Sequence, residues 1–401
     1  MRSLRVAFFL AVKSITRGNI GVTLLTIAML MLANLNILFF PSLVDGIIHS
    51  AEERLIDTFS GNIIIEATGD NPIIKKVDEL IARIEAIDGV TGVTYRNSMG
   101  AELVYEEEST NCVIRGVPPE REKEVFKIAD AVFEGSYLEA RELDQILLGV
   151  QLAGSDRQEI ELYSSSLRRV HAGDKISITY TNGVKKQYQV KGVFHTEFIQ
   201  TDMLAFVTER EFRSVNPLAN NRANTIHVKL RNDSEAVRII GEIAEFRDGL
   251  QFQTWEDTAG VIQSMTDSFA IIKGILTMVN LVVAGITVFI VTYIDLVNKR
   301  RQIGIERAVG ITPGAITMSY VFRAMFYAIL AVVTAWLLYI YAVVPLEARY
   351  PFHFPFGDVM LFVNQALLIR SALIILGVAI AAALLPVQQT IRIKLLDAIW
   401  E

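Results

Sequence analysis

Four long apolar runs dominate the pattern of hydrophobic and polar positions along the chain. They cover residues 20–40, 269–296, 316–344 and 371–387. Each run is long enough, or nearly so, to cross the ~30 Å hydrocarbon core of a bilayer as a helix of about 20 residues. The pattern therefore predicts four transmembrane helices, with one long and more polar segment, residues 42–267, between the first and the second.

The first apolar run also has features of a secretory signal peptide. Four basic residues and no acidic residue precede it: Arg2, Arg5, Lys13 and Arg17. A basic flank followed by an apolar stretch is common to signal peptides and membrane spans. The run is long for a signal peptide, however, and no small-x-small cleavage site follows Pro41. We therefore expect a spanning helix whose N-terminal end lies inside the cell.

The segment between the first two spans begins and ends with helix-like sequence. Residues 43–59 continue directly from the first apolar run, and residues 258–273 lead directly into the second; apolar residues recur in both at roughly helical spacing. We expect the two membrane helices to project outward as a stalk.

Within this frame, the sequence alternates between strand-like and helix-like patterns. The order strand, helix, strand occurs twice. The first unit covers residues 62–67, 73–87 and 92–105 and is followed by a further strand at 111–117. The second unit covers residues 225–230, 234–246 and 250–255. Two such units suggest one split α+β domain with an insertion at about 118–221. Inside the insertion, two strand-like runs flank Thr181-Asn182-Gly183, and Asn-Gly is a strong hairpin signal.

The expected fold class is an α-helical membrane protein with four transmembrane helices and a large α+β extracytoplasmic domain inserted between helices 1 and 2. We divide the chain into residues 1–60, with an amphipathic N-terminal helix, the first span and the stalk; the outer domain, 61–257; and residues 258–401, with the remaining spans, a cytoplasmic loop at 298–315 and a cytoplasmic C-terminus.

Composition and charge support this topology. Of the 401 residues, 52% are hydrophobic and only 20% are charged, which is too apolar for an ordinary soluble enzyme. Residues 42–267 carry 24 basic and 38 acidic side chains, whereas the rest of the chain carries 14 basic and 6 acidic ones. Basic segments are retained inside the cell, so the acidic domain is expected outside, with both termini and the loop between spans two and three inside. This charge distribution argues against nucleic-acid binding.

The chain lacks the usual motifs of catalysis. No Gly-Lys dipeptide occurs, so the phosphate-binding loop of many ATPases is absent, and HExxH, GxSxG and the Rossmann fingerprint are also missing. The lone Cys112 and five scattered histidines offer no metal-ligand spacing. We expect no catalytic residue, no metal site and no cofactor on this chain.

The cytoplasmic loop reads NKRRQIGIERAVG from residue 298 and restarts after Pro313. A short basic amphipathic helix at the membrane surface is the physical expectation, although a basic loop that only orients the protein fits equally well. Nearby, Asp295 and Arg323 lie toward the inner ends of spans two and three and could pair across helices. For residues so close to the interface we favour the alternative, in which each side chain snorkels to the lipid headgroups.

At these residues the chain resembles the FtsX/MacB/LolC type of ABC transporter permease. The family's loop pattern is close to R-x-E-I-G-x-x-R-A-x-G, and the chain follows it from Arg300 to Gly310 except that Gln302 replaces the usual acid. The opening AVKSITRGNIGVTLLTIAMLMLA, the outer segments LLGVQLAG and HAGDKISITYTNG, and the ending from Pro386 to Leu395-Leu396-Asp397-Ala398-Ile399 are also similar to the family. The closest architecture is LolC/LolE or a stand-alone MacB-like permease.

The resemblance implies a permease subunit that works by mechanotransmission. A separate ABC ATPase in two copies would bind ATP and Mg, and a second permease copy or paralogue, the lipid membrane and a periplasmic carrier or adaptor are the other implied partners. The resemblance places the protein in the cell inner membrane. The ATPase-coupling residues it implies are Arg301, Gln302, Ile303, Gly304, Ile305, Arg307, Val309 and Gly310.

The expected substrate is amphipathic or lipidated, such as a lipoprotein, and is taken up on the extracytoplasmic side. The four spans hold almost no ionisable groups, so they offer no obvious hydrophilic path. SGNIIIEATG, from residue 60, also resembles lipoprotein-releasing permeases more than drug exporters. Leu43, Ile47 and Met265 are the candidate substrate-facing stalk positions. The alternatives are a small-molecule or antibiotic efflux permease, and an FtsX-like signalling scaffold that activates a cell-wall hydrolase.

Overall fold

The computed structural model describes residues 2–17, 20–69, 73–154, 166–258, 260–354 and 357–391. Two compact units divide the chain. Unit 1 comprises Met1–Ile47, Thr266–Phe352 and Val359–Glu401, and unit 2 comprises Ile48–Met265 and His353–Asp358. Four helical segments are long and apolar enough to cross a membrane, namely Ile20–Ser60, Ser268–Asn298, Pro313–Arg349 and Gln365–Gln388. The prediction of four spans is confirmed.

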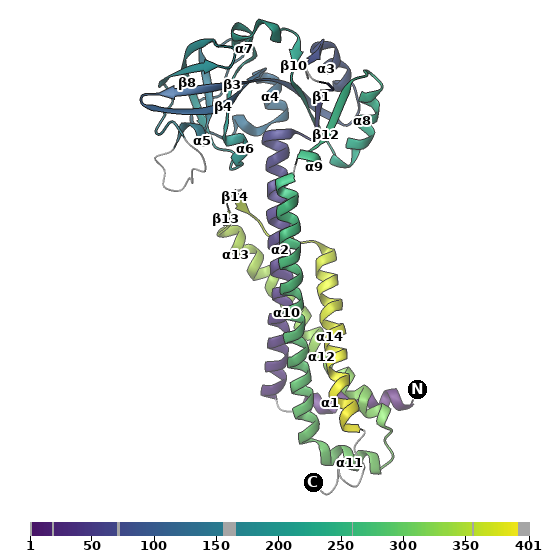
Figure 1. Ribbon diagram of the computed structural model, residues 1–401. Helices are drawn as coiled ribbons and strands as arrows, with labels where there is room; N and C mark the ends of the chain where they lie inside the picture. The colour runs from purple at the N-terminus through teal and green to yellow at the C-terminus, as the bar shows by residue number, and fades with distance from the viewer. Residues whose placement is uncertain are drawn as a thin grey trace. The chain divides into compact units, whose positions relative to one another are not determined.

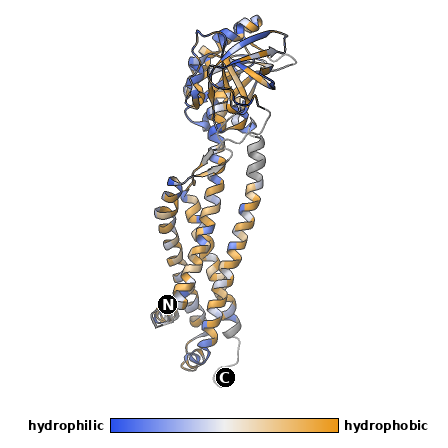
Figure 2. Cartoon of the chain, turned by 90° about the vertical axis from the view of Figure 1, so that its left-hand side faces the viewer, coloured by the Kyte–Doolittle hydropathy of each residue, from blue (hydrophilic) through white to orange (hydrophobic). Residues whose placement is uncertain are grey.

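Unit 1 is built from helices (Figure 1). Its elements are α1 (Arg2–Arg17), α2 (Ile20–Arg54), α10 (Gly260–Asn298), α11 (Arg300–Ala308), α12 (Pro313–Leu338), the π-helical turn η5 (Tyr339–Val343), α13 (Val344–Arg349), α14 (Gln365–Ile391) and the strands β13 (Phe352–Phe354) and β14 (Gly357–Val359). Four of them, α2, α10, β13 and β14, also have residues in unit 2. Figure 2 shows that the long helices are hydrophobic along most of their length.

Small side chains form the contact surfaces between the membrane helices. Ala328 and Ala331 of α12 and Ala379 and Ala383 of α14 are fully buried in one apolar cluster. Without a hydrophobic driving force in lipid, helices associate through close packing, which small residues permit. Large apolar residues lie instead on exposed faces, where lipid replaces water as their solvent: Ile271, Ile275, Met278, Val282 and Ile286 of α10 are about half exposed or more.

Unit 2 contains a ten-stranded sheet in the order β12-β1-β11-β3-β4-β9-β6-β8-β5, with β7 paired to β3 and β8. The strands are β1 (Ile63–Ala67), β3 (Val90–Tyr105), β4 (Glu108–Val117), β5 (Val132–Gly135), β6 (Gln145–Gly149), β7 (Lys175–Tyr180), β8 (Lys185–Phe194), β9 (Leu204–Thr208), β11 (Thr225–Leu230) and β12 (Leu250–Thr254). A separate pair joins β2 (Ile74–Lys75) to β10 (Arg222–Ala223).

Short helices flank these strands. They are α3 (Val77–Glu85), α4 (Pro119–Val125), α5 (Val150–Ala153), α6 (Ile199–Asp202), α7 (Glu209–Val215), α8 (Ala236–Ala244) and α9 (Trp255–Thr258), with the 3₁₀ turns η2 (Lys127–Ala129), η3 (Pro217–Ala219) and η4 (Asp233–Glu235).

The long strand β3 takes part in two hydrophobic cores. Its first half places Val93 and Tyr95 in a core shared with β1, β11, α3 and α8, while its second half places Ala101 and Leu103 in a core with the strands of the predicted insertion. The split pairing of early and late segments, inferred from sequence, is present: β1 pairs antiparallel with both β11 and β12. The predicted Asn-Gly hairpin joins β7 to β8, with Gly183 at a φ of 86°.

One helix prediction was wrong at its start. Residues 73–87 were expected to be helical throughout, but Ile74 and Lys75 form β2, and α3 begins only at Val77. Ile74 pairs with Ala223 of β10 and is fully buried, so a tertiary contact overrides the local helical pattern. Lys76 turns the chain between the two elements with a left-handed φ of 54°.

Helix α2 ends in unit 2 as a π-helical turn, η1 (Leu55–Ser60). The Ser60 hydroxyl donates to the Leu55 carbonyl five residues earlier, a spacing that fits the wider π-helical ladder. Gly61 then ends the helix with a φ of 71°, which only glycine adopts readily. The residues of this turn are held by side chains that come from the sheet.

A buried ion pair lies directly against this turn. Arg96 of β3 and Glu122 of α4 are both fully buried, with Arg96 Nη2 2.6 Å from Glu122 Oε1. Arg96 also donates through Nη1 to the Phe59 carbonyl at 2.9 Å, and Thr94 donates to the second Glu122 oxygen at 3.0 Å. The guanidinium carbon stands 3.8 Å from the centre of the Phe126 ring. The pair thus joins strand, helix and helix end in one network.

His227 of β11 completes the network. Its Nδ1 is 2.8 Å from the Ser60 carbonyl, which can only accept, so Nδ1 carries the proton and Nε2 accepts from Thr225. Burial, reinforced by the nearby Arg96 charge, holds the pKa of His227 well below its usual range. Burial also lowers the pKa of the neighbouring Arg115 to about 9, again with a contribution from Arg96. His227 is therefore neutral, and Glu122 is the carboxylate that balances the arginines.

Replacement of Glu122 by glutamine should destabilise unit 2 by about 3–5 kcal/mol, because it leaves Arg96 as a buried charge without a counterion. Hydrogen-exchange mass spectrometry of the full chain in detergent, read on peptides of β3 and β4, measures the change. Glu242→Gln is the matched control, since its ion pair with Arg238 is nearly half exposed and should contribute less than about 0.5 kcal/mol. Equal effects of the two substitutions would contradict a structural role for the buried pair.

Candidate functional site

The short helix predicted between spans two and three is present as α11, and one side of it is fixed by apolar packing. Ile303 is 7% exposed and belongs to a cluster with Leu296, Ile316, Tyr320 and Val387. Gly304 beside it is also buried. Gly310 turns the chain after the helix with a φ of 98°, and α12 begins at Pro313, a residue suited to the first turn of a helix. The helix is therefore a defined element between two spans.

The other side of α11 projects away from the chain. Ile305 is 52% exposed and Val309, four residues later, is 79% exposed. Arg301 and Gln302 are exposed as well, and Gln302 donates to Glu306 at 3.0 Å. Of the residues that the family resemblance suggested for coupling, Ile303 and Gly304 thus face inward, whereas Ile305 and Val309 form an uncovered apolar pair.

Asp295 and Arg323 are brought together by the packing of α10 and α12. Arg323 Nη1 lies 2.5 Å from Asp295 Oδ2, and Lys299 lies 3.2 Å from the other oxygen of the same carboxylate. The preference for separate snorkelling was wrong, because Arg323 is only 9% exposed and has its counterion within reach on the neighbouring helix. A charge that is paired with its counterion avoids most of the free-energy cost that an isolated charge has within a membrane span.

The three stalk positions differ in their surroundings. Leu43 is half-buried, and Ile47 is only 5% exposed, so Ile47 does not offer a free surface to a substrate as expected. The segment after β14 packs against this part of α2: the Phe362 carbonyl accepts a hydrogen bond from the Ser42 hydroxyl, and the Met360 carbonyl lies directly against Gly46. Met265 belongs to α10, but its side chain lies outside the described residues, as does the C-terminal motif at residues 395–399.

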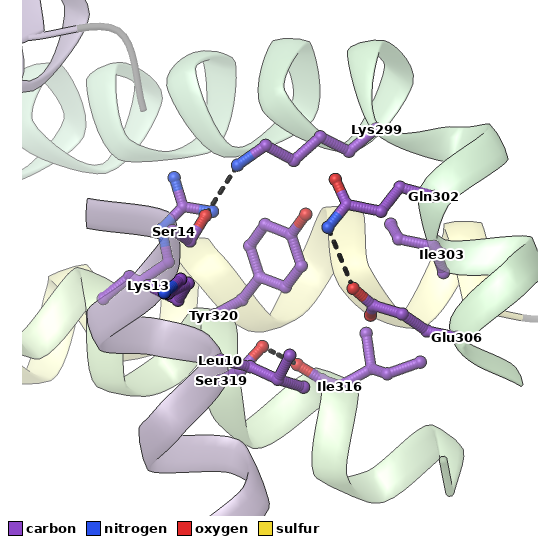
Figure 3. A pocket seen from close by; sticks show the side chains of 11 residues that line it. Leu10, Lys13, Ser14, Lys299, Gln302, Ile303, Glu306, Ile316, Ser319 and Tyr320 are labelled. Atoms are coloured by element: carbon purple, nitrogen blue, oxygen red, sulfur yellow. Dashed lines mark hydrogen bonds between the residues drawn. The ribbon is translucent and has the colours of Figure 1, made fainter. Parts of the chain in front are cut away.

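A pocket of about 340 Å³ adjoins α11, and sequence reasoning missed it. Figure 3 shows Lys13 and Ser14 of α1 on one side, Lys299 and Gln302 on the other, and the Tyr320 ring between them. The Lys299 ammonium donates to the Ser14 hydroxyl at 2.6 Å. The amphipathic pattern of residues 2–17 was the available signal, but it did not reveal which residues α1 would meet.

The described residues hold no cluster of side chains typical of a metal site. Among them, no three His, Cys, Asp or Glu side chains are placed to hold a metal ion. Burial raises the pKa of the Cys112 thiol to about 12, so this thiol stays protonated and a poor nucleophile at neutral pH.

Reversal of one charge in the Asp295–Arg323 pair should destabilise unit 1, because it places two like charges together in a partly buried site. Exchange of both residues should restore most of the lost stability. We expect the loss to be about 2–5 kcal/mol and read it as thermal unfolding of the chain in detergent. The Lys273–Asp45 pair, with side chains 30% and 37% exposed, provides a matched control with a smaller effect. Failure of the exchange to rescue either single variant would show that the two charges act separately.

Comparisons of the sequence with known families account for most of the chain. Residues 23–246 match the family of MacB-like periplasmic core domains, and residues 274–395 match the FtsX-like permease C-terminal family. No curated protein matches the chain.

Two solved structures are similar to part of the chain. The extracellular domain of the noncanonic ABC-type transporter YknZ from Gram-positive bacteria is 14% identical, with a TM-score of 0.34, over 48% of this chain and 98% of that domain. The periplasmic region of MacB from Actinobacillus actinomycetemcomitans is 11% identical, with a TM-score of 0.35, over 52% of this chain and 95% of that region.

The first family match alone covers more than half of the sequence, and the second covers the spans and the α11 segment that follow it. Together with four apolar helices and a large α/β domain between the first two, these matches identify a multi-pass membrane protein with a large extracytoplasmic domain. The chain belongs to the FtsX/MacB type of ABC transporter permeases.

Proposed function

We propose that this chain is the non-catalytic membrane subunit of a transporter driven by a separate ATPase. The observation that carries the proposal is an uncovered apolar pair, Ile305 of α11 and Val309, the residue that caps its C-terminal end. Helix α11 is short and is joined through Lys299 to the end of α10. An apolar pair one helical turn apart is the type of anchor that enters a groove on a partner protein. The absent phosphate-binding loop means that ATP and Mg would be held by that partner.

Helix α10 supports a mechanical form of coupling. It runs for 39 residues without a break from Gly260 to Asn298, which corresponds to about 58 Å at 1.5 Å per residue. A continuous hydrogen-bonded helix transmits displacement along its axis, because bending it would strain its backbone ladder. Closure of two ATPase copies would shift α11, and α10 would carry this shift to the extracytoplasmic domain.

The assembly would contain two permease chains, identical or related, in the cell inner membrane. Lys299, Arg300, Arg301 and Arg307 cluster in the loop between spans two and three, which favours the cytoplasmic side for this loop and for both termini. The acidic outer domain would then face the periplasm or the cell exterior, where a carrier or adaptor protein is the expected further partner.

The Ile305→Asp variant should weaken ATPase binding by about 1–3 kcal/mol, since a carboxylate would have to be desolvated in an apolar groove. The measurement is the dissociation constant of the purified permease and its ATPase in detergent, with ATP turnover followed in parallel. The permease alone should show no turnover. Val237→Asp is the control, because Val237 is 80% exposed in unit 2 and the exchange is chemically the same. Unchanged affinity and activity in the Ile305 variant would exclude α11 as the coupling element.

We further propose that the cargo is lipidated or otherwise amphipathic, such as a lipoprotein, and is taken from the outer leaflet or the external side. The ionisable groups within the spans support this route: Asp295 pairs with Arg323, and Lys273 pairs with Asp45 at 2.8 Å. Charges paired in this way do not form a continuous hydrophilic path across the spans. Large apolar side chains instead cover the exposed faces of the helices, which suits contact with acyl chains.

Photo-crosslinkers at Leu43, Ile271 and Ile275 should capture an acylated protein in membranes that contain the complete transporter. Ile271 and Ile275 are 65% and 58% exposed and flank Lys273 on α10. A crosslinker at the buried Ile47 is the matched control and should capture much less. Labelling of mid-membrane positions by a polar small molecule would favour efflux, and activation of a cell-wall hydrolase without any captured cargo would favour a signalling scaffold. Either result would overturn the proposed cargo.

A further inference from the structure

The pocket beside α11 lies where three helices of unit 1 meet: α1, α11 and the first turns of α12 (Figure 3). Its volume of about 340 Å³ is within the range of sites that hold small molecules. Ile303 and Ile316 form part of its wall, and both are buried, so the cavity is shaped by the same packing that fixes α11.

Cationic side chains outnumber carboxylates in the lining. Lys13, Lys299 and Arg323 face one lining carboxylate, Glu306, which accepts a hydrogen bond from Gln302. Asp295 does not line the pocket, but it neutralises one further positive charge through its contacts with Arg323 and Lys299. One net positive charge therefore remains. Within the described part of the chain, no carboxylate lies within ion-pair distance of the Lys13 ammonium.

Several polar groups of the pocket are hydrogen-bond donors. Lys299 already donates to the Ser14 hydroxyl, so the Ser14 proton is available to another acceptor. The Tyr320 side chain extends into the space between Lys299 and Lys13 (Figure 3). Ammonium and hydroxyl donors converging on a small cavity are suited to the oxygens of a phosphate ester.

The pocket also adjoins surface that favours lipid. Helix α1 exposes a series of large apolar side chains: Leu4, Val6, Phe8, Phe9 and Val12, each at least 40% exposed. Phe8 packs edge-to-face on Phe322 of α12, with ring centres 6.0 Å apart, so α1 is held alongside a membrane span. A helix with such a face lies in the interfacial layer, at the depth of the phospholipid headgroups.

We propose that this pocket binds the headgroup of an anionic phospholipid of the inner leaflet. The phosphate would be held between the ammonium groups of Lys13 and Lys299, and the acyl chains would extend along the apolar face of α1. Basic pockets beside membrane helices on the cytoplasmic side are typical sites for such headgroups. The apolar surface next to the cations favours a lipid over free phosphate, which would leave that surface uncovered.

A bound headgroup would connect α1 to the joint between α10 and α11. Among the described residues, the Lys299–Ser14 hydrogen bond already links α1 directly to this joint. A phosphate bridging Lys13 and Lys299 adds a second link of the charge-assisted type. This lipid would set the position of α11, and the inference goes beyond the proposed coupling to the ATPase.

Native mass spectrometry of the full-length permease, purified without any ATPase, tests the proposal. Titration with phosphatidylglycerol should show one saturable site per chain, and phosphatidylcholine should not fill it. Lys13→Gln and Lys299→Gln should each weaken phosphatidylglycerol binding about tenfold or more, as expected for loss of a charge-assisted hydrogen bond. Because binding is measured on the permease alone, the result is independent of whether α11 docks on an ATPase.

Arg5→Gln is the matched control. Arg5 is an exposed cation on the same helix, α1, but it does not line the pocket. Its loss should therefore reduce only the diffuse attraction of α1 to anionic lipid. Lys13→Gln leaves the Lys299–Ser14 bond intact, so its effect cannot be attributed to a displaced α11. Equal losses in the Arg5 and Lys13 variants, or competition by inorganic phosphate as strong as that by the lipid, would overturn the proposal.

Discussion

The buried contact between Arg96 and Glu122 is the constraint on which the organisation of unit 2 depends. Two side chains that are usually solvated are fully buried here, and their charges are satisfied by each other, by Thr94 and by the Phe59 carbonyl. Such a network is stable only when every member is in place. It therefore fixes the end of the helix that leaves the first span relative to β3 and α4.

The same helix end is held at several further points, which explains its π-helical form. Lys127 and Lys229 both reach Asp57, and Thr58 contacts Thr201 at 3.1 Å. The Asp57 carboxylate in turn raises the pKa of Lys127. These contacts come from separate parts of the sheet domain, so the turn must present Asp57, Phe59 and Ser60 to different partners at once. The helix end is therefore fixed to the sheet domain at several points.

Unit 1 follows a different physical rule. Its helices meet through alanine-rich surfaces, and the charges of Asp295 and Arg323 within its spans are paired, because an isolated charge is costly in lipid. Most of its polar chemistry is consequently concentrated where α1, α11 and α12 meet. The apolar pair that we propose as the ATPase contact and the pocket that we propose for a phospholipid lie within this one region and share the helix α11.

The sequence by itself determined the spans, the stalk helices and most strands of unit 2. The length of a hydrophobic run and the alternation of polar and apolar residues are local properties of the sequence. A membrane span requires the first, and a half-buried strand requires the second. The family, too, was recognisable from motifs in order, and Ile305 and Val309, two of the coupling residues that the resemblance implied, are exposed.

Tertiary structure alone decided which distant residues meet. Arg96 and Glu122 are 26 positions apart, and nothing in their local sequence indicates that both would be buried together. The start of α3 was mispredicted because Ile74 pairs with β10. The snorkelling of Arg323 was mispredicted because Asp295 of α10 lies next to it. Ile47, expected to face a substrate, is buried. Each of these outcomes depends on packing between elements remote in the chain, which periodicity does not encode.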